Sequence, residues 1–138
     1  MTSVYFVIVS SNDNLIYETN CINMEFDKPD ERMNLQQVTA YASMDVIMEK
    51  SLSSNQMYLG IVESSNGWLV YAFLTPSNHR FILLNTQLNE ESIRSLFIEI
   101  FDGFLKVTLN PFYQFNEPIT NKEFDIRVKN CLKRFVLK

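Results

Sequence analysis

The sequence predicts an α+β fold: one antiparallel sheet of five strands, with three helices over its two faces. Short β-branched and aromatic runs occur in pairs that turn residues separate, which is typical of hairpins. Three longer segments repeat apolar residues at helical spacing. These segments give the order β-β-α-β-β-β-α-α, and the length of 138 residues fits one domain over residues 1–138.

Turn residues mark where the predicted strands begin and end. The letters SNDN (11–14) separate the first two strands, and SNG (65–67) favours a type I′ turn between the third and fourth, because Asn-Gly tolerates positive φ angles. Residues 23–33 are mostly polar, contain Pro29 and are expected to form a loop. Five strands are therefore expected, at 4–10, 15–22, 57–64, 68–75 and 80–85.

Each predicted helix starts at a side chain that can cap its free amide groups. These capping residues are Asn34, Asn89 and Thr120, and the first two helices are expected to end at about Leu52 and Thr108. The second and third helices each carry an apolar stripe for the core: Ile93, Leu96, Phe97, Ile100 and Phe104 in one, and Phe124, Val128, Cys131, Leu132 and Phe135 in the other.

The first helix is apolar on more than one side. The stripe expected to cover the sheet is Leu35, Val38, Ala42 and Val46, and the apolar residues on other sides are Ala40, Met44, Ile47 and Met48. Such a helix is buried twice, so either neighbouring loops or a partner protein covers its remaining sides. Methionine is common at adaptable binding surfaces. Asp45, at the edge of the stripe, could pair with Lys50, stay solvated or make one charged contact in an interface.

The residue types that carry catalysis or bind cofactors are few and scattered. The three glycines are too far apart for a phosphate-binding loop, and His79 is the only histidine, in a turn where it is expected to be solvated. Two cysteines give too few ligands for a zinc site. We therefore expect no catalytic residue, no metal and no cofactor. The apolar run near the start is too short for a signal sequence or a membrane span, and a cytosolic protein is expected.

Charge is unevenly distributed along the chain. The net charge is −4, but from Lys122 onward six basic and two acidic residues give +4, against −8 in the remainder. A basic helix can face nucleic acid, a membrane or an acidic partner. A solvated face is the simpler interpretation, because no aromatic residues interleave the charges as a base-stacking surface requires.

The stretch NPFYQFNEPI (110–119) joins the last two predicted helices. Pro111 disfavours helix at the residue before it, and Pro118 favours extended backbone at Glu117. The aromatic residues Phe112, Tyr113 and Phe115 are expected to pin this connection to the core, with the Tyr113 hydroxyl in a hydrogen bond. The stretch is thus interpreted as a joint, with a direct binding role as the alternative.

With its elements placed, the sequence resembles the sedlin family, small longin-fold subunits of the transport protein particle (TRAPP) complex. The resemblance spans nearly the whole chain, through YFVIVSSNDNLIYE, SMDVIMEK, NQMYLG, WLVYAF, RFILL and NPFYQFNEPI…FDIRVK in that order. NPFY with a later Pro-Ile and Phe-Asp is its most specific part. A sister subunit of the complex shares it, while the YFVIV start favours sedlin proper. The resemblance implies a longin-like (SNARE-like) domain, with one helix on one face of the sheet and two on the other.

The resemblance also implies a function. The chain would be a non-catalytic adaptor of a complex that tethers vesicles between endoplasmic reticulum and Golgi and promotes nucleotide exchange on a Rab GTPase. Its partners would be small core and large peripheral subunits, with only indirect contact to the Rab protein. It would be cytoplasmic and perinuclear, and would meet membranes peripherally through the complex. The alternatives are the sister subunit, or a domain that binds an apolar ligand between sheet and helices, which the aromatic richness suggests.

The family's acidic position near the end of the first helix falls on Asp45 of this sequence. The resemblance therefore makes Asp45 a candidate for partner binding, together with its neighbours Met44, Ile47 and Met48. No nucleic-acid partner is implied.

Overall fold

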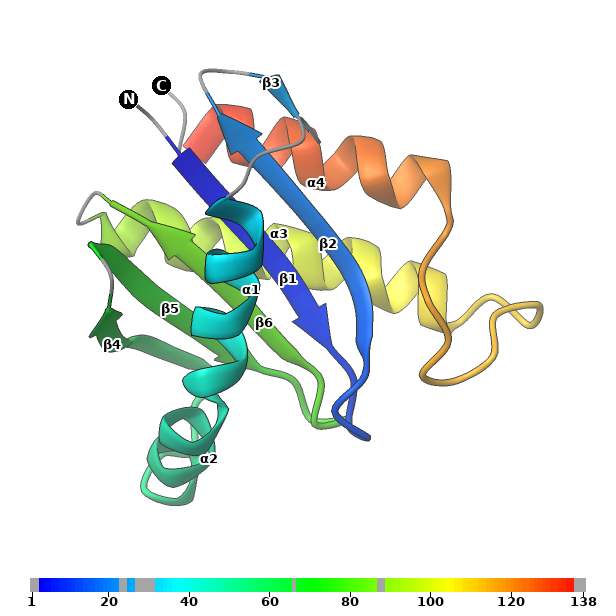
Figure 1. Ribbon diagram of the computed structural model, residues 1–138. Coiled ribbons are helices and arrows are strands. Elements are labelled where there is room, and N and C mark those ends of the chain that lie inside the picture. Colours follow the sequence, from blue (N-terminus) through cyan, green and yellow to red (C-terminus); the bar gives the residue numbers. More distant parts are fainter. Residues whose placement is uncertain (1–2, 23–24, 27–31, 66, 87–88, 136–138) are drawn as a thin grey trace.

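The computed structural model describes residues 3–22, 25–26, 32–65, 67–86 and 89–135. In this part of the chain, helices pack against one β-sheet. The elements are β1 (Ser3–Val9), β2 (Leu15–Ile22), β3 (Glu25–Phe26), α1 (Arg32–Ala42), α2 (Met44–Leu52), β4 (Tyr58–Ser65), β5 (Trp68–Leu74), β6 (Arg80–Asn85), α3 (Glu90–Thr108) and α4 (Lys122–Phe135). The sheet is antiparallel with the order β3-β2-β1-β6-β5-β4 (Figure 1). The predicted α+β, longin-like fold is confirmed.

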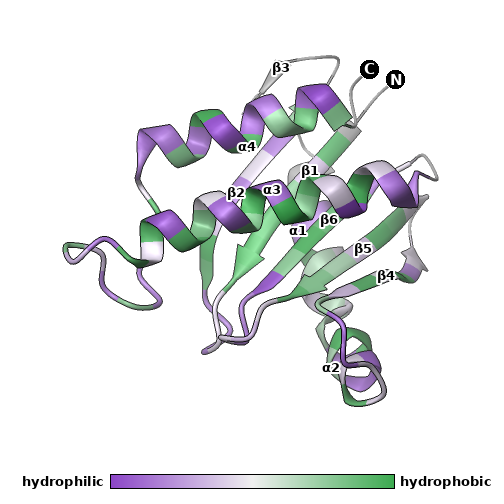
Figure 2. Cartoon of the chain, turned by 180° about the vertical axis from the view of Figure 1, so that it is seen from behind, coloured by the Kyte–Doolittle hydropathy of each residue, from purple (hydrophilic) through white to green (hydrophobic). Residues whose placement is uncertain are grey.

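Helices cover the two faces of the sheet unequally. α1 and α2, which replace the single first helix of the prediction, lie on one face (Figure 1). α3 and α4 lie side by side on the other face, toward the viewer in Figure 2. The five predicted strands are present, and the two-residue β3 adds to them at Glu25–Phe26, where a loop was expected. Two residues are too few to show a strand period, which is why the pattern did not predict β3.

Alternation along β1 divides its side chains between two cores. Val4, Phe6 and Ile8 belong to the cluster under α3 and α4, whereas Tyr5, Val7 and Val9 belong to the cluster under α1 and α2. Successive strand side chains point to opposite faces, so a strand that is apolar throughout is buried on both sides. β1 therefore lies at the centre of the sheet, paired with β2 and β6.

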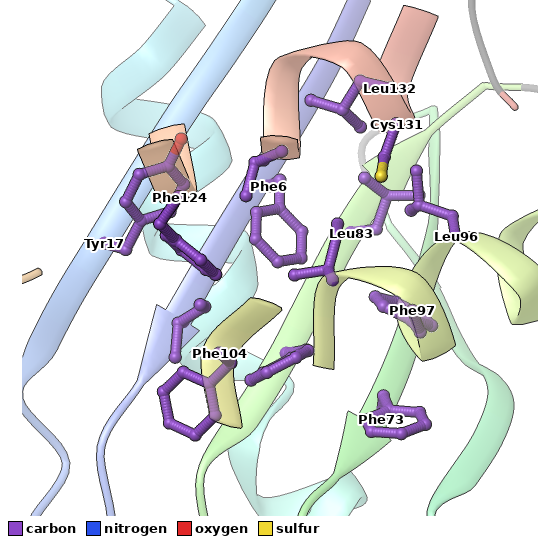
Figure 3. Close-up of a cluster of buried hydrophobic side chains, with 14 of the residues drawn as sticks. Phe6, Tyr17, Phe73, Leu83, Leu96, Phe97, Phe104, Phe124, Cys131 and Leu132 are labelled. Carbon is purple, nitrogen blue, oxygen red and sulfur yellow. The ribbon is translucent and has the colours of Figure 1, made fainter. Parts of the chain in front are cut away.

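Aromatic rings fill the core under α3 and α4. The Phe6 ring lies 6.2 Å from Tyr17, 6.0 Å from Phe81 and 6.4 Å from Phe97, measured between ring centroids. Figure 3 shows Phe6, Tyr17 and Phe97 converging from β1, β2 and α3. The Phe73 ring lies 5.6 Å from Phe97 and joins the same cluster. This packing accounts for the aromatic richness that suggested an apolar ligand.

His79 lies in the core, so its prediction as a solvated residue was wrong. Its side chain is 1% exposed, with the rings of Phe104 and Phe115 at 4.9 and 5.3 Å from its own. The turn before β6 closes on itself, because the Thr75 amide donates to the His79 carbonyl at 3.0 Å. This closure places the imidazole against the end of α3, a contact that local sequence does not reveal.

Stability should depend on pH through His79. Burial lowers the pKa of His79 below its ordinary 6.5, although contacts with Asn116 and Ser77 oppose the shift. The unfolded chain therefore binds a proton at a higher pH than the folded chain. The free energy of unfolding should be fully retained above about pH 6.5 and should fall as the pH drops toward the folded pKa.

Urea denaturation between about pH 8 and pH 5.5 measures this dependence, in a range above the ordinary pKa of carboxylates. His79→Gln should flatten the decline, and the assignment is clean because His79 is the only histidine. An equal decline in both proteins would show that another group is responsible.

Candidate functional site

A serine hydroxyl breaks the predicted first helix in two. The helix begins at Arg32, so Asn34 lies inside α1 and is not its cap, and α2 follows after Ser43. Ser43 is buried, and its hydroxyl donates to the Ala40 carbonyl at 2.7 Å. Such a bond to the preceding turn competes with helical hydrogen bonds and bends helices. α2 consequently leaves α1 at an angle, alongside β4 (Figure 1).

The side of α1 that faces the sheet is mostly polar or small. The residues buried there and at the start of α2 are Gln36, Thr39, Ala40, Ser43 and Ile47, each no more than 3% exposed. The predicted sheet-facing stripe was wrong in its first three members. Leu35 is 46% exposed, Val38 is 63% exposed, and Ala42 is also exposed, while only Val46 packs against the core.

Polar groups on the sheet explain this orientation. The Tyr5 hydroxyl donates to Glu18 Oε2 at 2.6 Å, and the Gln37 amide donates to the same oxygen at 3.4 Å. Burial, and then the hydrogen bond to Glu18, raises the pKa of Tyr5, so the phenol stays protonated as the donor. The helix therefore turns a polar face to a polar part of the sheet, which leaves its apolar residues outside.

The exposed apolar residues of α1 and α2 give a candidate surface, which we call the α1–α2 outer surface. Its members are Leu35, Val38, Tyr41, Met48 and Leu52, with exposures of 46%, 63%, 36%, 51% and 84%. Residues 33–42 contain no charged side chain. Absence of charge at the centre and a contiguous apolar patch are typical of protein interfaces.

A groove of about 260 Å³ adjoins this surface where the β1–β2 turn meets the start of α2. Its lining is Asp13, Tyr41, Met44, Asp45, Met48 and Arg80. Three of the four predicted partner-binding residues, Met44, Asp45 and Met48, thus come together. The fourth, Ile47, is 1% exposed and packs in the core, so its side chain does not reach the groove.

Asp45 presents an exposed carboxylate at the rim of the groove. It is exposed in the first turn of α2 and makes no ion pair or side-chain hydrogen bond with the described residues. The sequence allowed an ion pair between Asp45 and Lys50, but the Lys50 ammonium instead donates to the Ile61 carbonyl at 3.0 Å. Asp45 therefore remains available to a cation from outside the chain.

Arg80 and Asp13 complete the groove, and the sequence interpretation missed both. Arg80 Nη1 donates to the Ser10 carbonyl at 2.9 Å and to Asp13 Oδ1 at 2.6 Å. Asp13 has a φ of 66°, which the turn chemistry of SNDN could have suggested. The contact between β6 and this turn spans 67 positions and has no local signal.

Ser77 and His79 form a contact of the kind that nucleophilic enzymes use. Ser77 Oγ lies 2.8 Å from His79 Nδ1, and Thr75 Oγ1 lies 2.9 Å from the same hydroxyl. The imidazole is buried between Phe104 and Phe115, so the contact closes a turn and does not face a substrate site. Within the described ranges, no group of three or more His, Cys, Asp or Glu is placed to hold a metal ion. The helices of the same ranges are too short or too polar to span a membrane.

A family model described as Sedlin matches residues 8–134. The chain belongs to the sedlin family. The match runs from the end of β1 to the last turn of α4, so it includes both the α1–α2 outer surface and the α3–α4 connection. The sedlin resemblance of the individual sequence stretches is thereby confirmed over nearly the whole chain.

Curated relatives agree with the sedlin assignment. This sedlin chain is 36% identical over 139 residues to the "Probable trafficking protein particle complex subunit 2" of Drosophila melanogaster, with 99% of each chain covered. It is 29% identical over 136 residues to the "Transport protein particle 20 kDa subunit" of Schizosaccharomyces pombe, covering 97% of this chain and 99% of the relative. A "Trafficking protein particle complex subunit 2-like protein" of Xenopus tropicalis is 30% identical over 105 residues, covering 68% and 76%.

Proposed function

We propose that this chain is a non-catalytic adaptor subunit of a trafficking protein particle complex, and that the α1–α2 outer surface binds another subunit. The observation that carries the proposal is the orientation of α1, which buries Gln36 and exposes Val38. In an isolated chain, exposing the apolar side of a helix to water contributes no hydrophobic stabilisation. A partner that covers this side removes it from water and so gains that stabilisation on binding. The names of the relatives indicate which assembly supplies that partner.

The groove suggests the chemistry of the contact. Asp13 and Asp45 line it, Glu49 is exposed one turn beyond, and Arg80 is largely hidden behind Asp13. The exposed rim is therefore acidic, and a basic residue of the partner would complement it. Tyr41 and Met48 supply apolar walls for the same side chain, because long basic side chains pack their methylene stems on apolar surface.

The broader role follows the family. We propose that the chain acts as one domain and helps to join small core subunits to larger ones, in a complex that tethers vesicles between endoplasmic reticulum and Golgi. Nucleotide exchange on a Rab GTPase would be a property of the assembled complex, with the chain in indirect contact. Membrane association would be peripheral and through the complex, at a cytoplasmic, perinuclear location. The subunit 2 relatives, which match almost end to end, favour that subunit over the sister subunit.

Two substitutions test this surface. Val38→Asp places a charge at the centre of the apolar part, and Asp45→Tyr removes the carboxylate from the rim. Each should reduce co-purification of one and the same subunit with the tagged chain by about tenfold or more, as expected for the centre of an interface. The thermal midpoint of the isolated chain should hardly change, because both side chains are exposed.

Ile126→Asp is the matched control for Val38→Asp. Ile126 lies on α4, on the other face of the sheet, and is 57% exposed against 63% for Val38. It receives the same charge in a similar setting and should leave co-purification through the α1–α2 outer surface unchanged. Normal recovery of every subunit with the Val38 and Asp45 variants would refute the proposal.

A further inference from the structure

The connection between α3 and α4 presents apolar side chains to solvent. Phe112 is 92% exposed, Leu109 is 80% exposed and Phe115 is 63% exposed. Phe112, Tyr113 and Phe115 were expected to pin this connection to the core. The expectation was right for Tyr113, which packs against the core, and wrong for Phe112. It was partly right for Phe115, whose ring lies 5.3 Å from that of His79. In Figure 1 the connection projects from one end of the molecule, beyond the sheet.

Hydrogen bonds fix the connection in place. Its own residues close two turns, in which the Tyr113 amide donates to the Asn110 carbonyl at 3.0 Å and the Tyr113 hydroxyl donates to the Glu117 carbonyl at 2.7 Å. It is also tied to the β1–β2 hairpin. The Asn116 amide donates to Ser11 Oγ at 3.0 Å, and the Ile119 amide donates to the Ile16 carbonyl at 2.7 Å.

The α3–α4 connection keeps its structure without any contact from the Phe112 side chain. Ile119 is 8% exposed and Tyr113 is partly buried against the same core, while Asn110 and Tyr113 close the turn. Phe112 adds nothing to these contacts, since only its backbone amide is used, in a hydrogen bond to Asn110 Oδ1 at 3.0 Å. An aromatic side chain held in solvent on a fixed loop loses little conformational entropy when it binds, which is the property of an interface anchor.

Shape and charge indicate what this anchor fits. The residues from 109 to 121 include one charged side chain, Glu117, which is exposed and without a side-chain partner among the described residues. At the flanks, Lys106 is paired with Asp102 at 3.6 Å, and Lys122 lies beside Glu123. A hollow of about 210 Å³ beside Phe112 is lined by Glu117 and Pro118. Anionic lipid would require a basic surface here, so the charge favours a protein.

We propose that the α3–α4 connection is a second protein-docking surface, in which Phe112 inserts into an apolar pocket of a partner and Glu117 pairs with a basic residue at the rim of that pocket. The connection lies beyond α3 and α4, on the other side of the sheet from α1 (Figures 1 and 2), so both surfaces can be occupied at once. The choice of partner rests on the proposed function, because we seek it among the other subunits of the trafficking complex.

A photo-crosslinking experiment tests the proposal. Full-length chain with p-benzoylphenylalanine in place of Phe112 is added to the purified trafficking complex and irradiated. We expect an adduct with one polypeptide other than the chain itself. An excess of unlabelled wild-type chain should prevent this adduct from forming. Phe112→Ser and Glu117→Lys should each weaken binding of that polypeptide by about tenfold or more. Gln114→Ser, an exposed change in the same loop, should not.

Other outcomes separate this inference from the proposed function. An adduct with a second copy of the chain, or Phe112-dependent binding to vesicles of phosphatidylcholine and phosphatidylserine, would overturn it. So would normal binding by Phe112→Ser, whose thermal midpoint should equal that of the wild type because the side chain is exposed. If Val38→Asp loses a subunit and Phe112→Ser does not, only the second surface is refuted. If both variants bind normally, the adaptor proposal fails as well.

Discussion

Replacing Phe6 with alanine should lower the free energy of unfolding by about 3–5 kcal/mol, the range for truncating a buried phenylalanine. Phe6 is fully buried on the central strand β1, and its ring contacts Tyr17, Phe81 and Phe97 from three different elements. Those neighbours are themselves held by the sheet and α3, so they cannot close the cavity. Equilibrium denaturation in guanidinium chloride measures the loss.

Phe112→Ala is the matched control for the Phe6 prediction. It removes the same ring at a site that is 92% exposed, so its effect should stay within about 0.5 kcal/mol. Similar losses in the two variants would contradict the assignment of Phe6 to the core. The two variants also distinguish aromatic residues that stabilise the fold from those that bind a partner. Phe112→Ala should impair partner binding, whereas Phe6→Ala should impair folding.

The sheet was predictable because its strands repeat simple patterns. The central residues of β1 and β6 form continuous apolar runs, as expected of strands that are buried on both faces, and turn residues separate β1 from β2. The core stripe of α3 was also correct, from Ile93 to Phe104. For α4 the start was missed by one residue, since Asn121 Oδ1 accepts the Phe124 amide at 3.0 Å in the role predicted for Thr120.

α1 could not be oriented from its sequence because two apolar stripes compete on it. The periodic pattern favours the side with Leu35 and Val38, but the other side carries Gln37, which donates to Glu18 of β2, a residue 19 positions away in sequence. His79 was misplaced for a similar reason, since the rings that bury it come from α3 and the α3–α4 connection. Hydrophobic periodicity shows which residues share one side of a helix, but it does not show what that side packs against.

These errors bear on function. In α1 and in the α3–α4 connection, apolar side chains that were expected in the core, such as Val38 and Phe112, face solvent instead. An analysis of hydrophobic periodicity assigns the apolar stripe of a helix to the core of the same chain, so it fails where that stripe does not pack on its own sheet. The family resemblance singled out Asp45 as a candidate contact, whereas the groove beside it depends on contacts between the β1–β2 turn and β6 that have no local signal.

Arg80 should therefore matter for both stability and binding. Arg80→Met keeps much of the apolar stem and removes the two hydrogen bonds to Ser10 and Asp13. We expect a loss of about 2–3 kcal/mol in the free energy of unfolding, because the Arg80 side chain is 8% exposed and a hydrogen bond to a charged group contributes about 1.5–3 kcal/mol. Chemical denaturation measures this loss directly.

Asp13→Asn provides the comparison for Arg80→Met. The Asp13 side chain is 68% exposed, so its ion pair with Arg80 is screened and its loss should cost about 1 kcal/mol or less. A double-mutant cycle should then assign most of the Arg80 effect to the Ser10 carbonyl. If Asp13→Asn were as destabilising as Arg80→Met, the ion pair itself would hold the turn. With the turn released, the groove beside Asp45 loses one wall, so Arg80→Met should also weaken subunit binding at temperatures where the variant remains folded.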